Sequence, residues 1–357
     1  MVDLSTVAPV AATGLDLGLI SPRGRYAQPV RSVWVLAHGH SPTTDIYLKP
    51  RLDSLAARYV DTSRQAPPPT LADGAFVVIA RHAPRPWLRW LKARREALAG
   101  VALLLDDDIP GVLGGADLPL LYALKTAYRY VSTKALLAEV CDAVWVSTPW
   151  LQRKYAQVPT RLVAPLYVGA VPEPGAGPAT YFYHGTSAHA SEMAFLVEVV
   201  RQVQARLPNA LFEIVGGAAV RRLFRGIPRV RVLHPMAWPD FLAWSSAARH
   251  RVGLAPLLDT PFNQARSHNK LFDITRCGAA GVYSDLAVYR GTVLDGHSGL
   301  LRPNRPEAWI EAIIRLLADE AFRDGVFRNA LAWCEARGTD RHFALRPAGV
   351  AMWEAAP

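Results

Sequence analysis

The sequence predicts an α/β protein made of two doubly wound domains that face each other across a cleft. Its 357 residues exceed the roughly 250–300 that a single hydrophobic core usually covers. Short apolar runs alternate with helix-length segments along nearly the whole chain, which is typical of parallel sheets covered by helices. A stretch rich in Pro and Gly, Val168–Ala179, interrupts this alternation near the middle. We therefore place domains at residues 1–172 and 173–340, and expect residues 341–357 to cross back to the first domain.

In the first half, four short runs rich in Val, Ile and Leu predict buried strands, although periodicity alone does not exclude buried helix. These runs are Val33–Ala37, Phe76–Ala80, Val101–Leu105 and Ala143–Ser147. Helices are predicted between them, at Lys49–Tyr59, Pro86–Leu98 and Pro119–Val140.

The second half repeats this layout with more regular spacing. Its predicted strands are Tyr181–Tyr183, Phe212–Val215, Val230–Leu233, Val252–Ala255 and Gly281–Tyr283. Its predicted helices are Ser191–Arg206, Trp238–Ala247, Lys270–Cys277, Pro306–Leu317 and Glu320–Glu335. Ligands of such domains bind outside the carboxyl ends of the strands, so the loops after the strands should carry the chemistry.

Cysteine usage and the N-terminal sequence indicate a cytoplasmic protein. The three cysteines, Cys141, Cys277 and Cys334, are far apart and form no CxxC pair. This excludes a disulfide framework and a cysteine-based zinc site. The first twenty residues lack a basic region and contain Asp3 and Asp16, so they make a poor secretory signal.

The charge of +10 is compatible with nucleic acid, an anionic membrane or phosphate-bearing small molecules as partners. Residues 81–96 hold six Lys or Arg together with Trp87 and Trp90. This composition predicts a basic amphipathic segment on an anionic membrane surface; the alternative is a helix whose tryptophans face the core. No helix-turn-helix, RNA-recognition or zinc-finger pattern is present, so we expect no nucleic-acid partner.

The loop after the first strand of the second half is suited to a phosphate. Its polar or small residues are His184, Gly185, Thr186, Ser187 and His189. They precede a predicted helix, whose free N–H groups and positive dipole end attract anions. Ordinary capping of that helix is the alternative. Because neither GxGxxG nor GxxxxGK[ST] occurs, dinucleotide and P-loop sites lose support.

A second polar loop runs from Pro261 to Asp273. Arg266 and Lys270 are four residues apart, on one face of a helical start, where they could neutralise a departing phosphate. Asp273 could accept hydrogen bonds from ribose hydroxyls or pair with Lys270. Ser267 and Asn269 are further candidates for donor binding. The alternative is a solvated, charged helix face.

Two loops of the first half are candidates for the acceptor side. Asp106, Asp107 and Asp108 follow a predicted strand, and one of them could act as a general base or orient a hydroxyl. Helix capping is one alternative, and a divalent ion held by Asp107 and Asp108 is another. The earlier loop carries three more candidates for acceptor binding or proton transfer, with solvated histidines as the alternative: His38, His40 and Asp45.

The stretch from about Tyr181 to Leu317 resembles the C-terminal domain of GT-B glycosyltransferases of the group 1 type. The resemblance is carried by the order of five pieces: Phe212–Gly217, Gly253–Leu257, Asn269–Asp273, Gly278–Asp285 and Asp295–Leu301. It implies two Rossmann-like domains around a central cleft, with the nucleotide sugar on the second. Gly216, in the first piece, is accordingly assigned to the donor site.

The resemblance also assigns Asp273 to the second acid of the family's Glu-x7-Glu motif, which binds the nucleotide ribose. The first acid of that motif would fall at Ala265, so the sugar-contacting carboxylate is missing. The Arg and Lys that the family has in its first strand-helix loop are replaced by His184, Thr186 and His189.

We therefore expect a glycosyltransferase that moves a sugar from a nucleotide-sugar donor to a glycan or lipid-linked acceptor. The resemblance implies a role in bacterial cell-surface polysaccharide synthesis, such as lipopolysaccharide or capsule, and retention at the anomeric carbon. No cofactor or metal is expected, and the protein should be cytoplasmic or peripheral on the inner membrane face. The expected catalytic residues are Asp107, Asp108, His38, Arg266 and Lys270. The alternatives are a degenerate sugar-nucleotide-binding protein and a sugar-nucleotide epimerase of the same fold.

Overall fold

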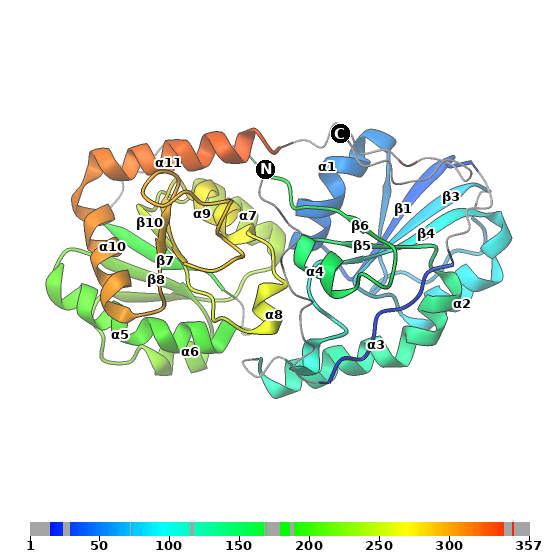
Figure 1. Ribbon diagram of the computed structural model, residues 1–357, viewed down its shortest axis with the longest axis horizontal. Coiled ribbons are helices and arrows are strands. Elements are labelled where there is room, and N and C mark those ends of the chain that lie inside the picture. Colours follow the sequence, from blue (N-terminus) through cyan, green and yellow to red (C-terminus); the bar gives the residue numbers. More distant parts are fainter. Residues whose placement is uncertain are drawn as a thin grey trace.

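The chain folds into two six-stranded sheets, one from each half of the sequence, and all strand pairs are parallel (Figure 1). The computed structural model describes residues 15–23, 29–71, 73–114, 118–167, 169, 179–185, 189–338 and 345. The predicted linker Val168–Ala179 and the segment 341–357 lie almost entirely outside these ranges, so the domain boundaries stay predictions.

The first sheet has the strand order β2-β1-β3-β4-β5-β6. Its strands are β1 (Ser32–Ala37), β2 (Arg58–Asp61), β3 (Ala75–Ala80), β4 (Leu98–Leu105), β5 (Ala143–Val146) and β6 (Thr160–Leu162). Every residue of β3, β4 and β5 is buried, which explains their uninterrupted apolar sequences. The helices of this half are α1 (Lys49–Leu52), α2 (Arg85–Ala93), α3 (Leu120–Val140) and α4 (Pro149–Lys154).

The second sheet has the order β12-β11-β10-β7-β8-β9. Its strands are β7 (Thr180–Tyr183), β8 (Leu211–Val215), β9 (Val230–Leu233), β10 (Val252–Ala255), β11 (Ala280–Ser284) and β12 (Leu300–Arg302). The helices are α5 (Ala190–Arg206), α6 (Ala218–Leu223), α7 (Trp238–Ala247), α8 (Pro261–Gln264), α9 (Asn269–Arg276), α10 (Pro306–Ala318) and α11 (Glu320–Glu335). Helices α5 and α10 pack on one face of this sheet and α9 on the other, while α11 contributes residues to both core clusters.

The two halves are joined by a continuous core and by hydrogen bonds between loops. One buried cluster contains Leu48 and Leu52 of the first half together with Leu271 and Phe272 of the second. The hydroxyl of Thr148 donates to the carbonyl of Ala265 at 3.1 Å, and the indole of Trp238 donates to Asp45 at 2.8 Å. These contacts hold the carboxyl ends of the two sheets against each other.

The structure corrects one predicted helix. The segment predicted as Lys49–Tyr59 is helical only to Leu52, continues as a 3₁₀ turn, and then reverses at Ala56, whose φ is 50°. Arg58–Asp61 instead forms β2, which pairs with β1 along its whole length. Strands β6 and β12 were not predicted, because three-residue edge strands carry too little pattern to be recognised.

The prediction that residues 81–96 place aromatic rings on a membrane is wrong. Trp87 and Trp90 are buried, together with Leu88 and Leu91, and their indoles donate to the carbonyls of Gln65 and Pro68. Helix α2 therefore turns its apolar side to the core, as the alternative reading proposed. Among the described residues, no helix is long and apolar enough to cross a bilayer.

Candidate active site

A cleft of about 430 Å³ lies between the two halves, at the carboxyl ends of both sheets. The first half contributes Ser41, Pro42, Thr43, Ile46, Arg81, Asp106, Asp107 and Tyr122 to its walls. The second half contributes Tyr183, His189, Pro256, Leu257, Arg266, Ser267, Asn269, Lys270, Asp273 and Tyr289. Eight of the residues predicted for the site therefore come together here: Asp106, Asp107, His189, Arg266, Ser267, Asn269, Lys270 and Asp273.

On the second half, Asp273 is fixed between two cations. Lys270 Nζ lies 3.1 Å from Oδ2 of its carboxylate, and Arg276 Nη1 lies 3.1 Å from Oδ1. Burial alone would raise the pKa of Asp273, but these two cations lower it below its ordinary value. Lys270 also donates to the backbone carbonyl of His184. The predicted pairing of Asp273 with Lys270 is thus confirmed, and the carboxylate is ionised at neutral pH.

Arg266 is held in the cleft without a counter-ion. Its Nη1 lies 3.0 Å from Nε2 of His189, and its guanidinium lies over the ring of Phe262. It forms no ion pair with any described residue, and its buried Nε has no hydrogen-bond partner among them. A buried donor without a partner costs free energy unless a ligand satisfies it. Arg266 is therefore the residue best placed to receive an anion.

His189 is neutral in this arrangement. Burial, aided by the charge of Arg266, lowers its pKa to about 4, although Glu192 opposes the shift. Because a guanidinium can only donate, Nε2 of His189 must accept, which leaves the imidazole proton on Nδ1, 3.7 Å from Glu192. His189 thus orients Arg266 and adds no charge of its own.

On the first half, Arg81 joins two of the three acidic residues. It donates to Asp106 through two nitrogens and to Asp107 at 2.9 Å. Asp106 also accepts from the hydroxyl of Thr43 at 2.7 Å, so its oxygens are engaged within the protein. Asp107 keeps Oδ1 free of hydrogen bonds from the described residues.

The pKa of Asp107 is raised by burial, with smaller contributions from Asp106 and Asp108, although Arg81 and Arg266 act in the opposite direction. The influence of Arg266 reaches Asp107 from the other half of the chain, across the cleft. A carboxylate of raised pKa with one open oxygen is suited to hold or accept the proton of a hydroxyl group.

The prediction of a catalytic Asp108 is not supported by its position. This residue is 2% exposed and does not line the cleft. It accepts from Lys154 at 2.6 Å, from the hydroxyl of Tyr155 and from the backbone of Gly111. A divalent ion held jointly by Asp107 and Asp108 is likewise not supported, because their carboxylates are bound by different cations.

His184 also departs from its predicted role. Its side chain is buried beneath the cleft, where its Nε2 lies 3.1 Å from Glu213. The same carboxylate oxygen lies 3.0 Å from Nε2 of His250, and Arg231 pairs with the other oxygen at 2.5 Å. Among the described residues, only this His184–Glu213–His250 group has its ligand atoms close enough for a metal ion. The backbone carbonyl of His184, by contrast, accepts a hydrogen bond from Lys270 of the cleft and helps to position it.

Gly185 and Gly216 do not line the cleft either. A Cβ at Gly185 would lie 2.5 Å from the hydroxyl of Tyr183, and one at Gly216 would lie 2.3 Å from the side chain of Val220. Both glycines are therefore required by close packing at strand ends. Thr186 and Ser187 lie outside the described residues.

The predicted acceptor residues of the first loop lie elsewhere. His38 is exposed, with its ring 5.6 Å from that of His82. His40 lines a separate cavity of about 200 Å³ beside Tyr59. Asp45 is buried and pairs with Lys49 and with Trp238 of the second half. Its position indicates a role in joining the two halves, not in binding an acceptor.

Several residues of the cleft were not predicted. Arg81 was assigned to a membrane segment. It directly follows strand β3, as Asp106 directly follows the neighbouring strand β4, and this placement was a signal for an ion pair at the strand ends. Tyr122, Tyr183 and Tyr289 carry no sequence signal of function. Tyr47, buried next to the cleft, bonds to Ser267 and to Asn269 at 3.0 Å, and so carries part of the contact between the halves.

Ala265 stands where the resemblance would place the first acid of the motif, and it is completely buried. It packs in the core cluster of the first half, and its carbonyl accepts from Thr148. No space for a carboxylate is present at this position. The chain therefore lacks the first acid of the motif, and the backbone at this position is covered by the first half.

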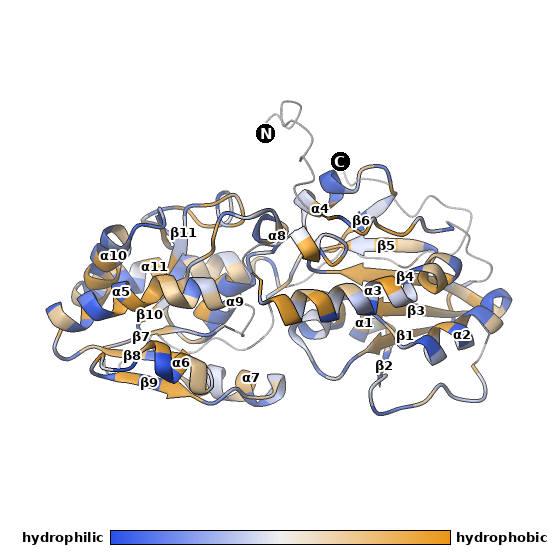
Figure 2. Cartoon of the chain, turned by 90° about the horizontal axis from the view of Figure 1, so that it is seen from below, coloured by the Kyte–Doolittle hydropathy of each residue, from blue (hydrophilic) through white to orange (hydrophobic). Residues whose placement is uncertain are grey.

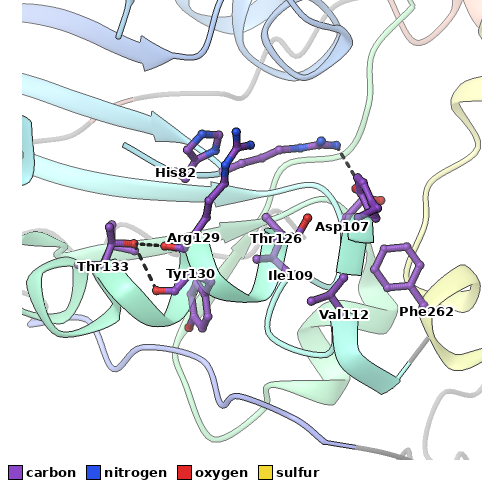
Figure 3. A pocket seen from close by; sticks show the side chains of 12 residues that line it. His82, Asp107, Ile109, Val112, Thr126, Arg129, Tyr130, Thr133 and Phe262 are labelled. Atoms are coloured by element: carbon purple, nitrogen blue, oxygen red, sulfur yellow. Dashed lines mark hydrogen bonds and ion pairs between the residues drawn. The ribbon is translucent and has the colours of Figure 1, made fainter. Parts of the chain in front are cut away.

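A smaller cavity of about 110 Å³ adjoins the cleft and shares Arg81, Asp107 and Tyr122 with it (Figure 3). Helix α3 forms one wall with Thr126, Arg129, Tyr130 and Thr133, and Phe262 of the second half lies at one end. Burial, together with the nearby charges of Arg129 and Arg81, lowers the pKa of His82 to about 4. Two arginines, Arg81 and Arg129, and a single acid, Asp107, line this cavity.

Residues 179–319 match the sequence model of the family described as Glycosyl transferases group 1. No protein with a curated description matches the sequence. These two findings limit the sequence-level comparison to the second half of the chain.

Solved structures extend the comparison to the first half. A sucrose-phosphate synthase from Thermosynechococcus elongatus has a TM-score of 0.57 at 16% identity, over 86% of this chain and 95% of that chain. The Anabaena protein HepE, solved with UDP-glucose, has a TM-score of 0.57 at 11% identity over the same shares. The pneumococcal O-GlcNAc transferase GtfA, solved with UDP and GlcNAc, has a TM-score of 0.52 at 14% identity over 75% of this chain.

This chain covers only 54% of GtfA, so it spans about half the length of that enzyme. At such low identities the likeness concerns the fold, and the family match is confined to residues 179–319. The chain has the GT-B fold, and residues 179–319 are similar to the group 1 glycosyltransferases.

Proposed function

We propose that the protein is a glycosyltransferase that moves a sugar from a nucleotide-sugar donor on its second half to an acceptor hydroxyl on its first half. The observation that carries the proposal is Arg266, a cation without a counter-ion, which faces Asp107 across one cleft. A nucleotide sugar supplies the diphosphate that Arg266 lacks, and the acceptor supplies the hydroxyl for Asp107.

The donor side would act by stabilising the leaving group. Arg266 and Lys270 lie on the same wall of the cleft, and fixed cations there stabilise charge that develops on a departing diphosphate. Asp273, held by Lys270 and Arg276, keeps lone pairs with which it can accept from ribose hydroxyls. UDP or UDP-glucose accompanies two of the structural neighbours, so UDP-sugars are the first donors to test.

The acceptor side would act by placing a hydroxyl beside Asp107. Arg81 fixes one oxygen of this carboxylate and leaves the other for the substrate. In our proposal Asp107 orients the attacking hydroxyl and favours loss of its proton.

The stereochemistry, the acceptor class and the metal requirement of the transfer can be proposed as well. We propose retention of the anomeric configuration, a glycan or lipid-linked acceptor of a bacterial cell-surface polysaccharide, and turnover without a divalent metal. The group 1 match of residues 179–319 supports the first. Transfer should then survive chelation by EDTA, and the anomeric signal of the product should match that of the donor.

The direct test is nucleotide binding by Arg266→Gln. Titration calorimetry with UDP, GDP, dTDP and CMP, free and as sugar conjugates, should show binding by the unaltered chain. Loss of a charge-assisted contact should weaken that binding roughly 10- to 100-fold. Arg225→Gln removes the same charge from an exposed position of the second half and should bind normally. Absence of binding to every nucleotide tested would refute the proposed function.

A second candidate is a sugar-nucleotide-binding protein without transfer activity. Burial of Ala265, at the position of the missing acid, is the observation that favours it. This candidate would be favoured if nucleotide binding depends on Arg266 but no reaction follows. No reaction means neither transfer to a glycan or lipid-linked acceptor nor conversion of the free sugar nucleotide. Conversion without an acceptor would indicate an epimerase.

A further inference from the structure

Helix α3 exposes an apolar face to solvent. Five large apolar side chains on it are strongly exposed: Leu120 (71%), Leu121 (82%), Leu124 (49%), Tyr128 (73%) and Val131 (54%). They make up half of the ten exposed large apolar residues found in the described part of the chain. Figure 1 shows α3 along the lower edge of the first half, and the view from below in Figure 2 shows its first turns coloured hydrophobic.

These side chains form one continuous surface. At about 100° per residue, all five fall within an arc of about 100° around the helix axis. Another side of α3, which includes Tyr130 and Leu137, is buried against the first half. Helix α3 is therefore apolar on two sides, and packing inside the protein accounts for only one of them.

Positive charge surrounds this apolar face. Helices α2 and α3 pack together, with Arg85 donating to the carbonyl of Ser132 at 3.0 Å. Between them they carry six cations and a single acid, Glu139, which is paired with Lys92 at 2.6 Å. The cations are Arg85, Arg89, Lys92, Lys125, Arg129 and Lys134. An apolar surface with a cationic border matches the chemistry of an anionic lipid bilayer.

The same helix forms a wall of the active site. Tyr122, Thr126 and Arg129 of this helix lie on its other side and line the small cavity next to the cleft (Figure 3). The guanidinium of Arg129 forms no hydrogen bond or ion pair with any described residue. An acceptor bound beside this helix could reach Asp107 through the cavity that Arg81 and Arg129 line.

We propose that the exposed face of α3 docks the protein on an anionic membrane surface. Leu120, Leu121, Leu124, Tyr128 and Val131 enter the interfacial region, and the cations around them contact the lipid headgroups. The consequence for the acceptor, which rests on the proposed function, is that it is carried by the membrane and enters through the small cavity. A second copy of the chain is a less suitable occupant, because it would bring the same cations against one another.

The test is binding of the full chain to vesicles. Sedimentation with vesicles of phosphatidylcholine containing phosphatidylglycerol should carry down the protein, and vesicles of phosphatidylcholine alone should carry down much less. Raising the salt from about 0.1 M to about 1 M should weaken binding, because it screens the headgroup attraction. The double variant Leu121→Glu with Leu124→Glu should reduce the partition coefficient at least about tenfold.

The matched control is the double variant Leu223→Glu with Leu294→Glu, which adds the same charges at exposed leucines of the second half. It should bind vesicles like the unaltered chain. Both variants should keep their nucleotide affinity, so failure of the docking surface and failure of the proposed function can be told apart.

Three results would overturn the proposal. The first is absence of binding to the anionic vesicles, and the second is equal loss of binding in both double variants. The third is a dimer in sedimentation equilibrium that dissociates only on substitution of Leu121 and Leu124, which would assign the face to a second copy of the chain.

Discussion

Arg81 adopts a backbone conformation that is rare for an arginine, with φ at 64°, directly after strand β3. Such a conformation costs of order 1–3 kcal/mol and persists only where the surroundings enforce it. Here the backbone N–H bonds to Leu104, and the guanidinium bridges Asp106 and Asp107. The strained residue is thus the one that aims Asp107 into the cleft.

Asp107→Asn should abolish transfer and leave nucleotide binding intact. The amide keeps the shape of the side chain but cannot orient and activate a hydroxyl as a carboxylate does, so turnover should fall by about 10²-fold or more. Rates with the best donor and acceptor should be measured beside the dissociation constant of the nucleotide. Unchanged turnover would remove Asp107 from the mechanism.

Asp108→Asn is the matched control, because it makes the same change one residue away. Asp108 is tied to Lys154 and Tyr155 outside the cleft, so its loss should lower the melting temperature and spare turnover per folded molecule. A variant that melts normally but does not turn over would restore Asp108 as a catalytic residue.

Among the elements of the second half, the turn between α8 and α9 shows how the proposed donor site differs from the motif of the resemblance. Ala265 lies in that turn, fully buried against the first half. Ala265→Glu, which recreates the acid of the motif, should therefore not improve transfer. It should destabilise the protein by about 3 kcal/mol or more, because it overpacks the core and buries a charge.

Thermal unfolding and transfer rates check this prediction. Ala265→Gln, of nearly the same volume but uncharged, separates the effect of crowding from that of charge and should destabilise the protein less. A stable Ala265→Glu variant with faster transfer would show that the turn can open to admit an acid.

The central strands were predictable from sequence because they are buried on both faces, which leaves continuous apolar runs such as Phe76–Ala80. The directions of the side chains at strand ends could not be predicted from the sequence. Successive residues after a strand point different ways, so Asp106, Asp107 and Asp108 bind three different sets of partners. Glu213, an acid inside an apolar strand, was a signal that buried partners such as His184 exist.

The contact between the two halves explains why Asp45 lies away from the cleft and why Tyr47 was not predicted. Both residues lie in the short helical segment Thr44–Leu48 that follows β1, where a polar residue favours a functional interpretation of the sequence alone. Their partners Trp238 and Asn269 lie more than 190 residues away in the chain. Only the packed structure shows that these side chains join the halves.

At the scale of the whole molecule, buried neutral histidines should make the fold sensitive to acid. Burial lowers the pKa of each of four histidines to about 4: His82, His184, His189 and His268. In the unfolded chain a histidine has a pKa of about 6.5, so between pH 6.5 and 4 the unfolded state binds more protons. These groups therefore remove stability as the pH falls through that window.

Two aspartates act in the opposite direction. Burial raises the pKa of Asp142 to about 6 and also raises that of Asp107, so both take up protons more readily in the folded state. The four histidines outnumber these aspartates, so unfolding takes up protons on balance near pH 5 and the free energy of unfolding falls as the pH falls. Lowered pKa values of Glu213 and Asp273 extend the loss of stability below pH 4.5.

Denaturant unfolding between pH 7 and pH 4.5 should therefore show a free energy that falls steeply below pH 6.5. His268→Phe isolates one contribution, because the imidazole packs between the rings of Phe272 and Trp333 and a phenyl ring can replace it there. In this variant unfolding should take up about one proton fewer, so the free energy of unfolding should depend less steeply on pH. The reason is that the substitution removes one group that is neutral when folded and charged when unfolded. A free energy that stays constant or rises on acidification would mean that these histidines are hydrated and protonated in the folded protein.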